Sequence, residues 1–173
     1  MDFIDIMQTY FRGEKLEATF YILPVGLLLI GLAVTAVRAE HGGFAWAIAV
    51  PCALVGLTLI GVGATVATRT DAQVASIEQS FHENPQVLAR EERDRIAKVN
   101  ANFRLTYFAF GLVAAFGIVI HYLGGMDWGR GLGAALILIG DIGLLIDGFA
   151  ERRAELYTQA LDALSAKASP PVD

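Results

Sequence analysis

The chain of 173 residues is 55% hydrophobic and only 18% charged, with a mean hydropathy of +0.52, which is too apolar for an ordinary soluble domain of this length. A formal net charge of −5 at pH 7 argues against a nucleic-acid partner, because phosphate binding needs a cationic face. The single cysteine, Cys52, excludes an intramolecular disulfide and a cysteine-based metal site, and we interpret it as a small buried hydrophobe.

Residues 1–13 predict an amphipathic helix at the membrane surface. Apolar side chains recur there at the spacing of one helix face, as Phe3, Ile6, Met7 and Tyr10, and Gly13 then ends the run. A helix of this kind lies in the plane of the lipid headgroups.

Four apolar stretches follow, each close to the roughly 20 residues that a helix needs to cross a bilayer. They are residues 17–37, 44–67, 105–123 and 132–149. The stretches pair into two transmembrane hairpins, within residues 14–69 and 104–150, each turned by a Gly-Gly pair. The sequence therefore predicts an all-α integral membrane protein, a four-transmembrane-helix bundle with short cytoplasmic amphipathic helices.

Residues 70–103 are expected to form a helical cytoplasmic connection between the hairpins. Thr70 or Asp71 can cap its first helix. Asn84-Pro85 then breaks the chain, and the helical pattern restarts at Gln86 and runs into the third stretch. Two pairs four residues apart, Glu91–Arg95 and Asp94–Lys98, are expected to stabilise this second helix.

Residues 151–173 predict a cytoplasmic helix and a loose tail. Apolar stripes on this helix and on the connection either dock on one another or present a face to a partner protein. The candidates for partner binding are Val74, Ile77, Phe81, Leu156 and Leu164.

Basic residues lie mainly before the first stretch, in the central connection and after the fourth stretch, while only Arg38 and Arg130 lie on the other side. Because cytoplasmic loops carry the excess of Lys and Arg, both termini are expected in the cytoplasm of a cell whose inner (plasma) membrane holds the protein. A shift of 82 or 83 residues also superimposes the two halves, for example Gly42-Gly43 on Gly124-Gly125. This pattern indicates a tandem repeat of two hairpins.

Glycines are expected to bring the helices together, because close backbone approach replaces the hydrophobic effect as the attraction between helices in lipid. Gly129 and Gly133 form a small-xxx-small pair at the start of the fourth stretch, and Gly140 continues that face.

Asp141 is the main polar feature at depth. An ionised carboxylate in hydrocarbon costs roughly 2.5–3.5 kcal/mol, so Asp141 is expected to face the bundle interior or to be protonated, with the Thr58 hydroxyl at the same depth as its partner. Asp147 lies nearer the membrane surface and is expected to pair with Arg104.

The sequence contains no catalytic motif, and it excludes several enzyme classes. All four serines lie outside the apolar stretches, which removes the nucleophile of a serine intramembrane protease, and Leu138 occupies the first glycine position of the Gly-x-Gly-Asp pattern of aspartyl intramembrane proteases. His41 and His121 lack the further ligands that a metal or haem site needs. We expect no catalytic, metal or cofactor site.

The leading hypothesis is a non-enzymatic protein that binds another membrane component, as an accessory subunit or an inhibitor. In size, span number and cytoplasmic termini the chain resembles membrane-embedded immunity proteins against pore-forming bacterial toxins, although no motif residue carries a role over. One alternative is a small transporter or channel, as a monomer or a homodimer, in which Asp141 handles a proton or cation. The other is a purely structural assembly protein.

Overall fold

The computed structural model describes the backbone of residues 2–168 and the side chains of residues 2–166. Everything regular within that range is helical. The helices are α1 (Phe3–Glu17), a π-helical turn η1 (Ala18–Ile22), α2 (Leu23–Ala39), α3 (Gly43–Glu83), α4 (Pro85–Leu123) and α5 (Asp127–Ala168). The all-α fold expected from the sequence is confirmed.

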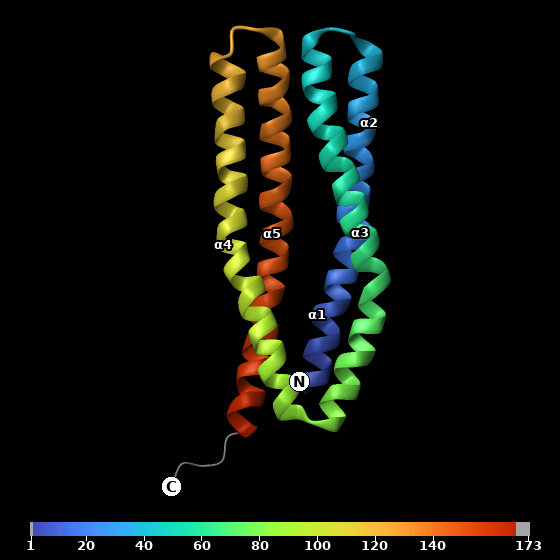
Figure 1. Cartoon of the computed structure of the whole chain (residues 1–173), viewed down its shortest axis with the longest axis vertical. Helices are drawn as coiled ribbons and strands as arrows, with labels where there is room; N and C mark the ends of the chain where they lie inside the picture. The colour runs from blue at the N-terminus through green and yellow to red at the C-terminus, as the bar shows by residue number, and fades with distance from the viewer. Residues whose placement is uncertain (1, 169–173) are drawn as a thin grey trace.

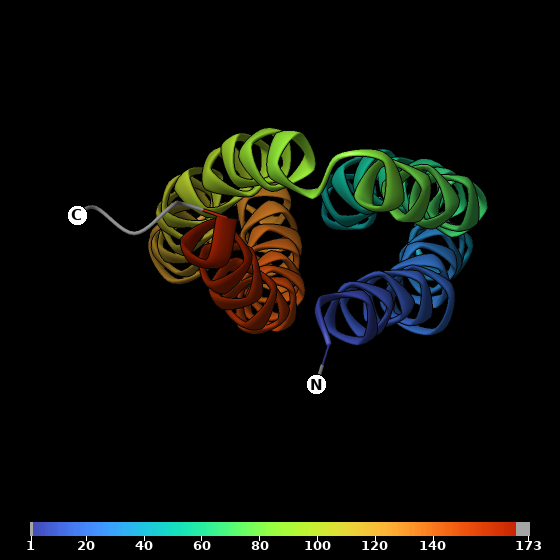
Figure 2. The ribbon, with the colours of Figure 1, turned by 90° about the horizontal axis from the view of Figure 1, so that it is seen from below.

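The molecule consists of two long hairpins that stand side by side, α1–α2 with α3 and α4 with α5 (Figures 1 and 2). Four helices are long and apolar enough to cross a membrane, as predicted, and each has between 37 and 41 residues. At 1.5 Å per residue they are about 60 Å long, twice the roughly 30 Å of the hydrocarbon core. About half of the bundle therefore extends beyond the bilayer.

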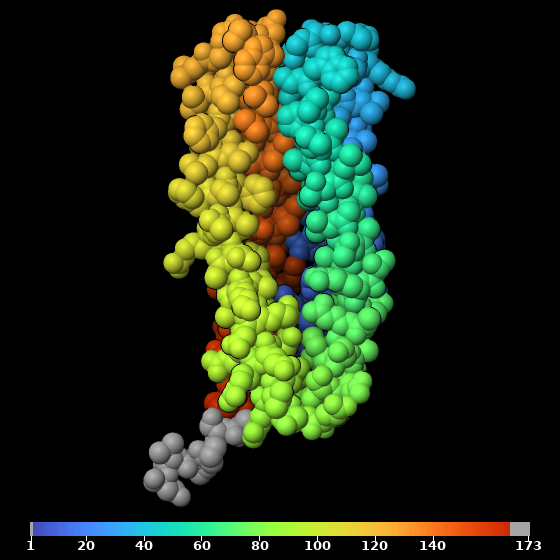
Figure 3. All heavy atoms as spheres, viewed as in Figure 1, coloured from blue at the N-terminus to red at the C-terminus, as the bar shows by residue number. Residues whose placement is uncertain are grey.

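Helix α5 holds the two hairpins together. It packs along α4 within its own hairpin and on α3 and α1 of the other one. In the space-filling view of Figure 3, α5 is recessed between α4 and α3. The face of α5 turned away from these neighbours is open to the surroundings of the bundle, and it carries the site described below.

The expected end of the first helix at Gly13 is wrong. Helix α1 continues through this residue, and the π-turn η1 joins it to α2 without a break. A single glycine costs a helix only about 1 kcal/mol, and here it allows a close contact, because a Cβ at Gly13 would lie 2.6 Å from Cδ of Arg153. The apolar face of α1 is buried against the other helices, with Phe3, Met7 and Phe11 in the core.

The second apolar stretch also continues further than expected, and the cap at Thr70 or Asp71 is wrong. Helix α3 runs unbroken to Glu83. The Thr70 hydroxyl donates to the carbonyl oxygen of Val66 at 2.6 Å, and Asp71 pairs with Lys15 of α1 at 2.6 Å. Both side chains are thus engaged without ending the helix.

The break at Asn84-Pro85 is confirmed. The Asn84 side chain accepts hydrogen bonds from the backbone N–H groups of Gln86 and Val87, each at 3.2 Å, and Pro85 occupies the first helical position, where its missing N–H costs nothing. The two expected pairs on α4 are wrong for the described residues, since Arg95 pairs with Glu92, three residues away, at 2.8 Å.

The half of the bundle that contains α1 has a core built from all four long helices, which we call the aromatic cluster. It comprises Phe3, Met7, Phe11, Ile77, Leu88, Ile96, Ala154, Tyr157 and Leu161. Ile77 belongs to this cluster, and Val74, Phe81 and Leu164 pack against it. The stripes therefore dock on one another, and four of the five partner-binding candidates are occupied by the chain's own core. Leu156 alone of the five is exposed, at 64%.

In the other half, close glycine contacts hold each hairpin. A Cβ at Gly26 would lie 2.8 Å from the carbonyl oxygen of Gly56, and a Cβ at Gly133 would lie 2.6 Å from that of Gly117. Small residues are thus what allow the backbones to approach, as expected. A smaller core of Leu29, Ala33, Ala49, Cys52 and Ala135 joins the hairpins here, and it buries Cys52 completely.

Candidate interaction site

Asp141 lies on the outer surface of α5, and the expectation that it faces the bundle interior is wrong. Its neighbour Gly140 faces α4, where a Cβ would lie 2.8 Å from the backbone nitrogen of Ala114. Ala135 and Ile142 face the other hairpin. Successive helix residues are turned by about 100°, so the residue after Gly140 points away from α4, and Asp141 is exposed.

The surroundings of Asp141 on this surface are apolar. Leu138 and Leu145, one turn before and one turn after it, are 37% and 53% exposed, and Phe149 is 51% exposed. No hydrogen bond or ion pair joins Asp141 to another residue in the described part of the chain. The structure thus presents an unpaired carboxylate on an apolar helix face in the middle of a predicted span.

Thr58 is not the partner of Asp141. It is exposed on α3, and its hydroxyl donates to the carbonyl oxygen of Leu54 in the same helix at 2.9 Å. A threonine in a helix commonly satisfies its hydroxyl in this way, which leaves no need for a partner across the bundle.

The predicted pair of Asp147 and Arg104 is also wrong. Arg104 is exposed and forms no ion pair within residues 2–166, while Oδ2 of Asp147 is buried and accepts no hydrogen bond there. Asp147 lies instead near Glu17, which pairs with Arg153, and the negative charges of Asp147 and Glu17 repel each other.

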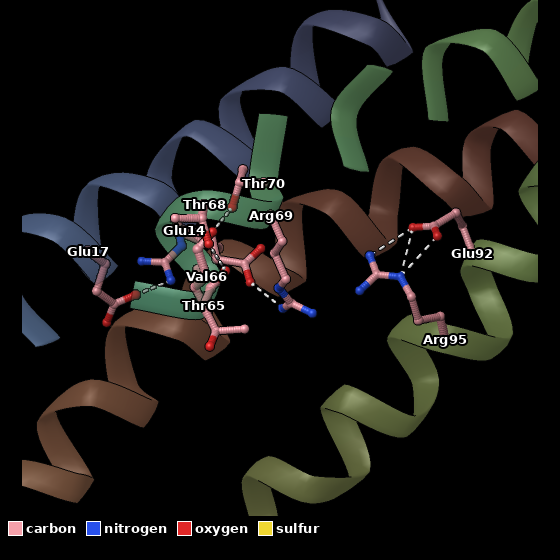
Figure 4. A network of polar contacts seen from close by, with 10 residues as sticks. Glu14, Glu17, Thr65, Val66, Thr68, Arg69, Thr70, Glu92 and Arg95 are labelled. Carbon is pink, nitrogen blue, oxygen red and sulfur yellow. Dashed lines mark hydrogen bonds and ion pairs between the residues drawn. The ribbon is translucent and has the colours of Figure 1, made fainter. Parts of the chain in front are cut away.

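The Glu17–Arg153 pair was missed by the sequence analysis. Arg153 Nη2 donates to Oε2 of Glu17, which joins the start of the first apolar stretch to the helix after the fourth. The Glu17 side chain is only 9% exposed, and it stands at the end of α1, directly before the π-turn (Figure 4). A charged residue at the very start of an apolar stretch indicates that it needs a partner. The sequence does not show which one, because the partner lies 136 residues away along the chain.

A second polar network closes the aromatic cluster. Arg95 donates from Nε and Nη2 to the Glu92 carboxylate at 2.9 and 2.8 Å (Figure 4), and the Tyr157 hydroxyl donates to the same carboxylate at 2.9 Å. Burial, together with the charge of Glu92, raises the pKa of Tyr157. The carboxylate is thus committed to two partners, and the network is structural in character.

Further polar links join α1 to α3 at the same end of the molecule. Glu14 accepts from Arg69 at 3.3 Å (Figure 4). Lys15 of α1 pairs with Asp71 of α3. These pairs are largely exposed and contribute little individually. Within the described residues, no cluster of three or more His, Cys, Asp or Glu side chains that could hold a metal ion is present.

A groove of about 490 Å³ opens between α1 and α5, beside the aromatic cluster. Tyr10 and Gly13 of α1 line one side, and Leu156, Ala160 and Ala163 of α5 line the other. Leu156 thus belongs to a recess, which distinguishes it from an isolated exposed leucine. The groove and the Asp141 surface lie on the same helix.

No protein-family model, curated protein or solved structure matches this chain.

Proposed function

We propose that this is a non-enzymatic multi-pass membrane protein that works by binding another membrane protein through the outer face of α5. The proposal rests on one observation, the exposed and unpaired Asp141 among apolar side chains. An ionised carboxylate at the centre of a bilayer costs roughly 2.5–3.5 kcal/mol. A helix docked on this face would offset that cost by hydrogen bonding or charge pairing, whereas lipid would not.

On this proposal, the chain acts as an accessory subunit or as an inhibitor of the membrane protein that it binds. A pore-forming toxin is one partner of this class, in keeping with the layout shared with immunity proteins. The proposal includes an inner (plasma) membrane with both termini in the cytoplasm, which follows from the distribution of basic residues. The proposal does not require a tandem repeat. A shift of 82 residues places Gly117 and Gly133 of the second hairpin on Thr35 and Pro51. The close glycine contact of the first hairpin is instead between Gly26 and Gly56.

The transport alternative receives less support from the same geometry. A proton or cation path needs polar groups along an enclosed route, yet Asp141 and Thr58 are exposed on different helices and Thr58 is bound within its own helix. A purely structural protein would bind its neighbours through the apolar stripes. Within this chain, however, the stripe residues pack in or against its own core, namely Val74, Ile77, Phe81 and Leu164.

Site-specific photo-crosslinking in living cells tests the proposal. A photoreactive residue replaces Leu145 on α5 or, as the control, Leu28 on α2, which is 71% exposed on another apolar face. We expect a discrete protein adduct from position 145, its loss in the Asp141→Leu variant, and no adduct from position 28. Lipid adducts alone at both positions would contradict the proposal, and so would a protein adduct that still forms in the Asp141→Leu variant.

A further inference from the structure

Eight of the exposed residues of α5 form one continuous strip along the helix. They follow one another at intervals of three or four residues, which is the spacing of a single helix face. The strip consists of Leu138, Asp141, Leu145, Phe149, Arg152, Leu156, Gln159 and Ala163. At 1.5 Å per residue, its length is about 38 Å. It is therefore longer than the hydrocarbon core and extends past one edge of the bilayer.

Two charges stand on this strip, Asp141 and Arg152, and neither forms an ion pair with another described residue. They are eleven residues apart, or about 16 Å along the axis. Between them the strip is apolar, with Leu145 and Phe149 exposed, and the exposed Leu156 follows Arg152. The exposed Glu151 and Glu155 lie beside the strip on the same helix. A ligand that offers a cation at the depth of Asp141 and an anion about three turns away would match both charges of the strip.

The end of the strip beyond Arg152 forms one wall of the groove between α1 and α5. Leu156, Gln159 and Ala163 belong to both. The walls of this groove are mainly apolar, and its volume of about 490 Å³ has room for large apolar side chains. The strip thus combines a charge pair with a recess, in a fixed order along one helix.

We infer that the strip binds one helix of a partner membrane protein, which carries Lys or Arg opposite Asp141, Asp or Glu opposite Arg152, and an apolar side chain that enters the groove. The inference rests on the proposed function, because it takes the partner to be a membrane protein, and it adds the chemistry by which that partner is recognised. The partner's opposite charges lower the free-energy cost of covering Asp141 and Arg152, and its apolar side chain packs in the groove.

A second copy of this chain is a poorer occupant. Copies in one membrane share one orientation, so a symmetric contact through α5 would place equal residues at equal depth. Asp141 would then face Asp141, and Arg152 would face Arg152. Like charges at close range are unfavourable, most of all where no water screens them.

Designed transmembrane peptides test the chemistry without knowledge of the natural partner. Each is a Leu/Ala helix: the matched peptide has Lys at mid-span and Glu eleven residues later, the swapped peptide exchanges the two, and the neutral peptide has Leu at both places. Binding to the labelled full-length protein is measured by energy transfer in phosphatidylcholine vesicles. We expect the matched peptide to bind about 10-fold more tightly than the other two.

Three variants locate the effect. Asp141→Asn should remove most of the preference for the matched peptide. The double charge reversal Asp141→Lys/Arg152→Glu should transfer the preference to the swapped peptide. The control is Asp141→Leu combined with Leu28→Asp, which moves the acid to another exposed apolar face. Full recovery of the preference in this control would overturn the inference, since any exposed acid would then suffice.

The groove is tested separately. Ala163→Trp should fill it from an exposed position and weaken binding of a matched peptide that carries Phe at the level of the groove. The same variant should leave a matched peptide with Ser at that place unchanged. Equal loss for both peptides, or no loss for either, would contradict the part assigned to the groove.

Failure of the inference and failure of the proposed function are distinguishable. If position 145 crosslinks to a protein in cells but the peptides show no charge preference, the chemistry inferred here is wrong and the proposed function stands. If the adduct in cells is a dimer of this chain, the occupant is a second copy and the inference is overturned.

Discussion

Tyr157 is the largest side chain that the described part of the protein buries completely, and its hydroxyl reaches the Glu92 carboxylate at 2.9 Å. Burial and the nearby Glu92 charge raise its pKa above the ordinary 10.0. The folded protein therefore holds the phenol proton more tightly than the unfolded chain does. This stabilisation is complete below about pH 10 and falls as the pH rises towards the raised pKa.

We predict that stability declines above about pH 10 by up to about 1.4 kcal/mol per pH unit for each such proton, and that Tyr157→Phe reduces this slope. Tyr10, whose pKa is also raised by burial and by Glu14, contributes to the remaining slope. At neutral pH the same variant should cost about 1.5–3 kcal/mol, because a hydrogen bond to a charged group is lost. Denaturant unfolding in micelles across this pH range is the measurement, and equal slopes in both proteins would refute the prediction.

At the scale of the helices, glycine decides how closely the members of a hairpin approach. A Cβ at Gly133 of α5 would lie 2.5 Å from the backbone nitrogen of His121 and 2.6 Å from the carbonyl oxygen of Gly117, whereas a Cβ at Gly111 meets no atom within 4 Å. A clash with backbone cannot be relieved by a side-chain movement, so the helices themselves must separate.

We predict that Gly133→Ala destabilises the protein by about 1–3 kcal/mol through overpacking, while Gly111→Ala stabilises it by up to about 1 kcal/mol, because alanine favours the helix over glycine. Thermal unfolding in one detergent, followed by circular dichroism, compares the two. Destabilisation of similar size at both positions would show that the close contact between α4 and α5 is not the cause.

At the scale of the whole molecule, the two hairpins are held by α5 through its packing on α3 and α1, and the Glu17–Arg153 pair spans that junction. The pair is partly buried, with the Arg153 side chain 25% and the Glu17 side chain 9% exposed. Removal of one member of a fully buried pair leaves the other charge without a partner, which commonly costs about 3–5 kcal/mol, while replacement of both by apolar residues is far less costly. The cost is smaller where one side chain reaches water.

We therefore predict that Arg153→Leu weakens the attachment of α1 to α5, seen as faster hydrogen exchange in α1, with a smaller effect in α2. The double variant Glu17→Leu/Arg153→Leu should recover most of the lost protection. No difference between the single and double variants would mean that the pair does not link the hairpins.

The sequence by itself determined the four long apolar helices and the break at Asn84-Pro85, because hydropathy and the chemistry of Asn and Pro act within a few residues. It also indicated that small residues bring the helices together, but it left open whether the stripes around Ile77 and Leu164 dock within the chain or on a partner. Residue-by-residue pattern was enough, since each of these features depends on neighbours one or two turns away.

Only the tertiary structure decided which way the polar side chains point and with which residues they pair. Asp141 lies outside because Gly140 and Gly133 commit one face of α5 to α4, and Ala135 and Ile142 commit another to the second hairpin. Glu17 meets Arg153 across the bundle. The rotation of a helix about its axis is set by packing against distant segments, and helical periodicity alone does not contain that information.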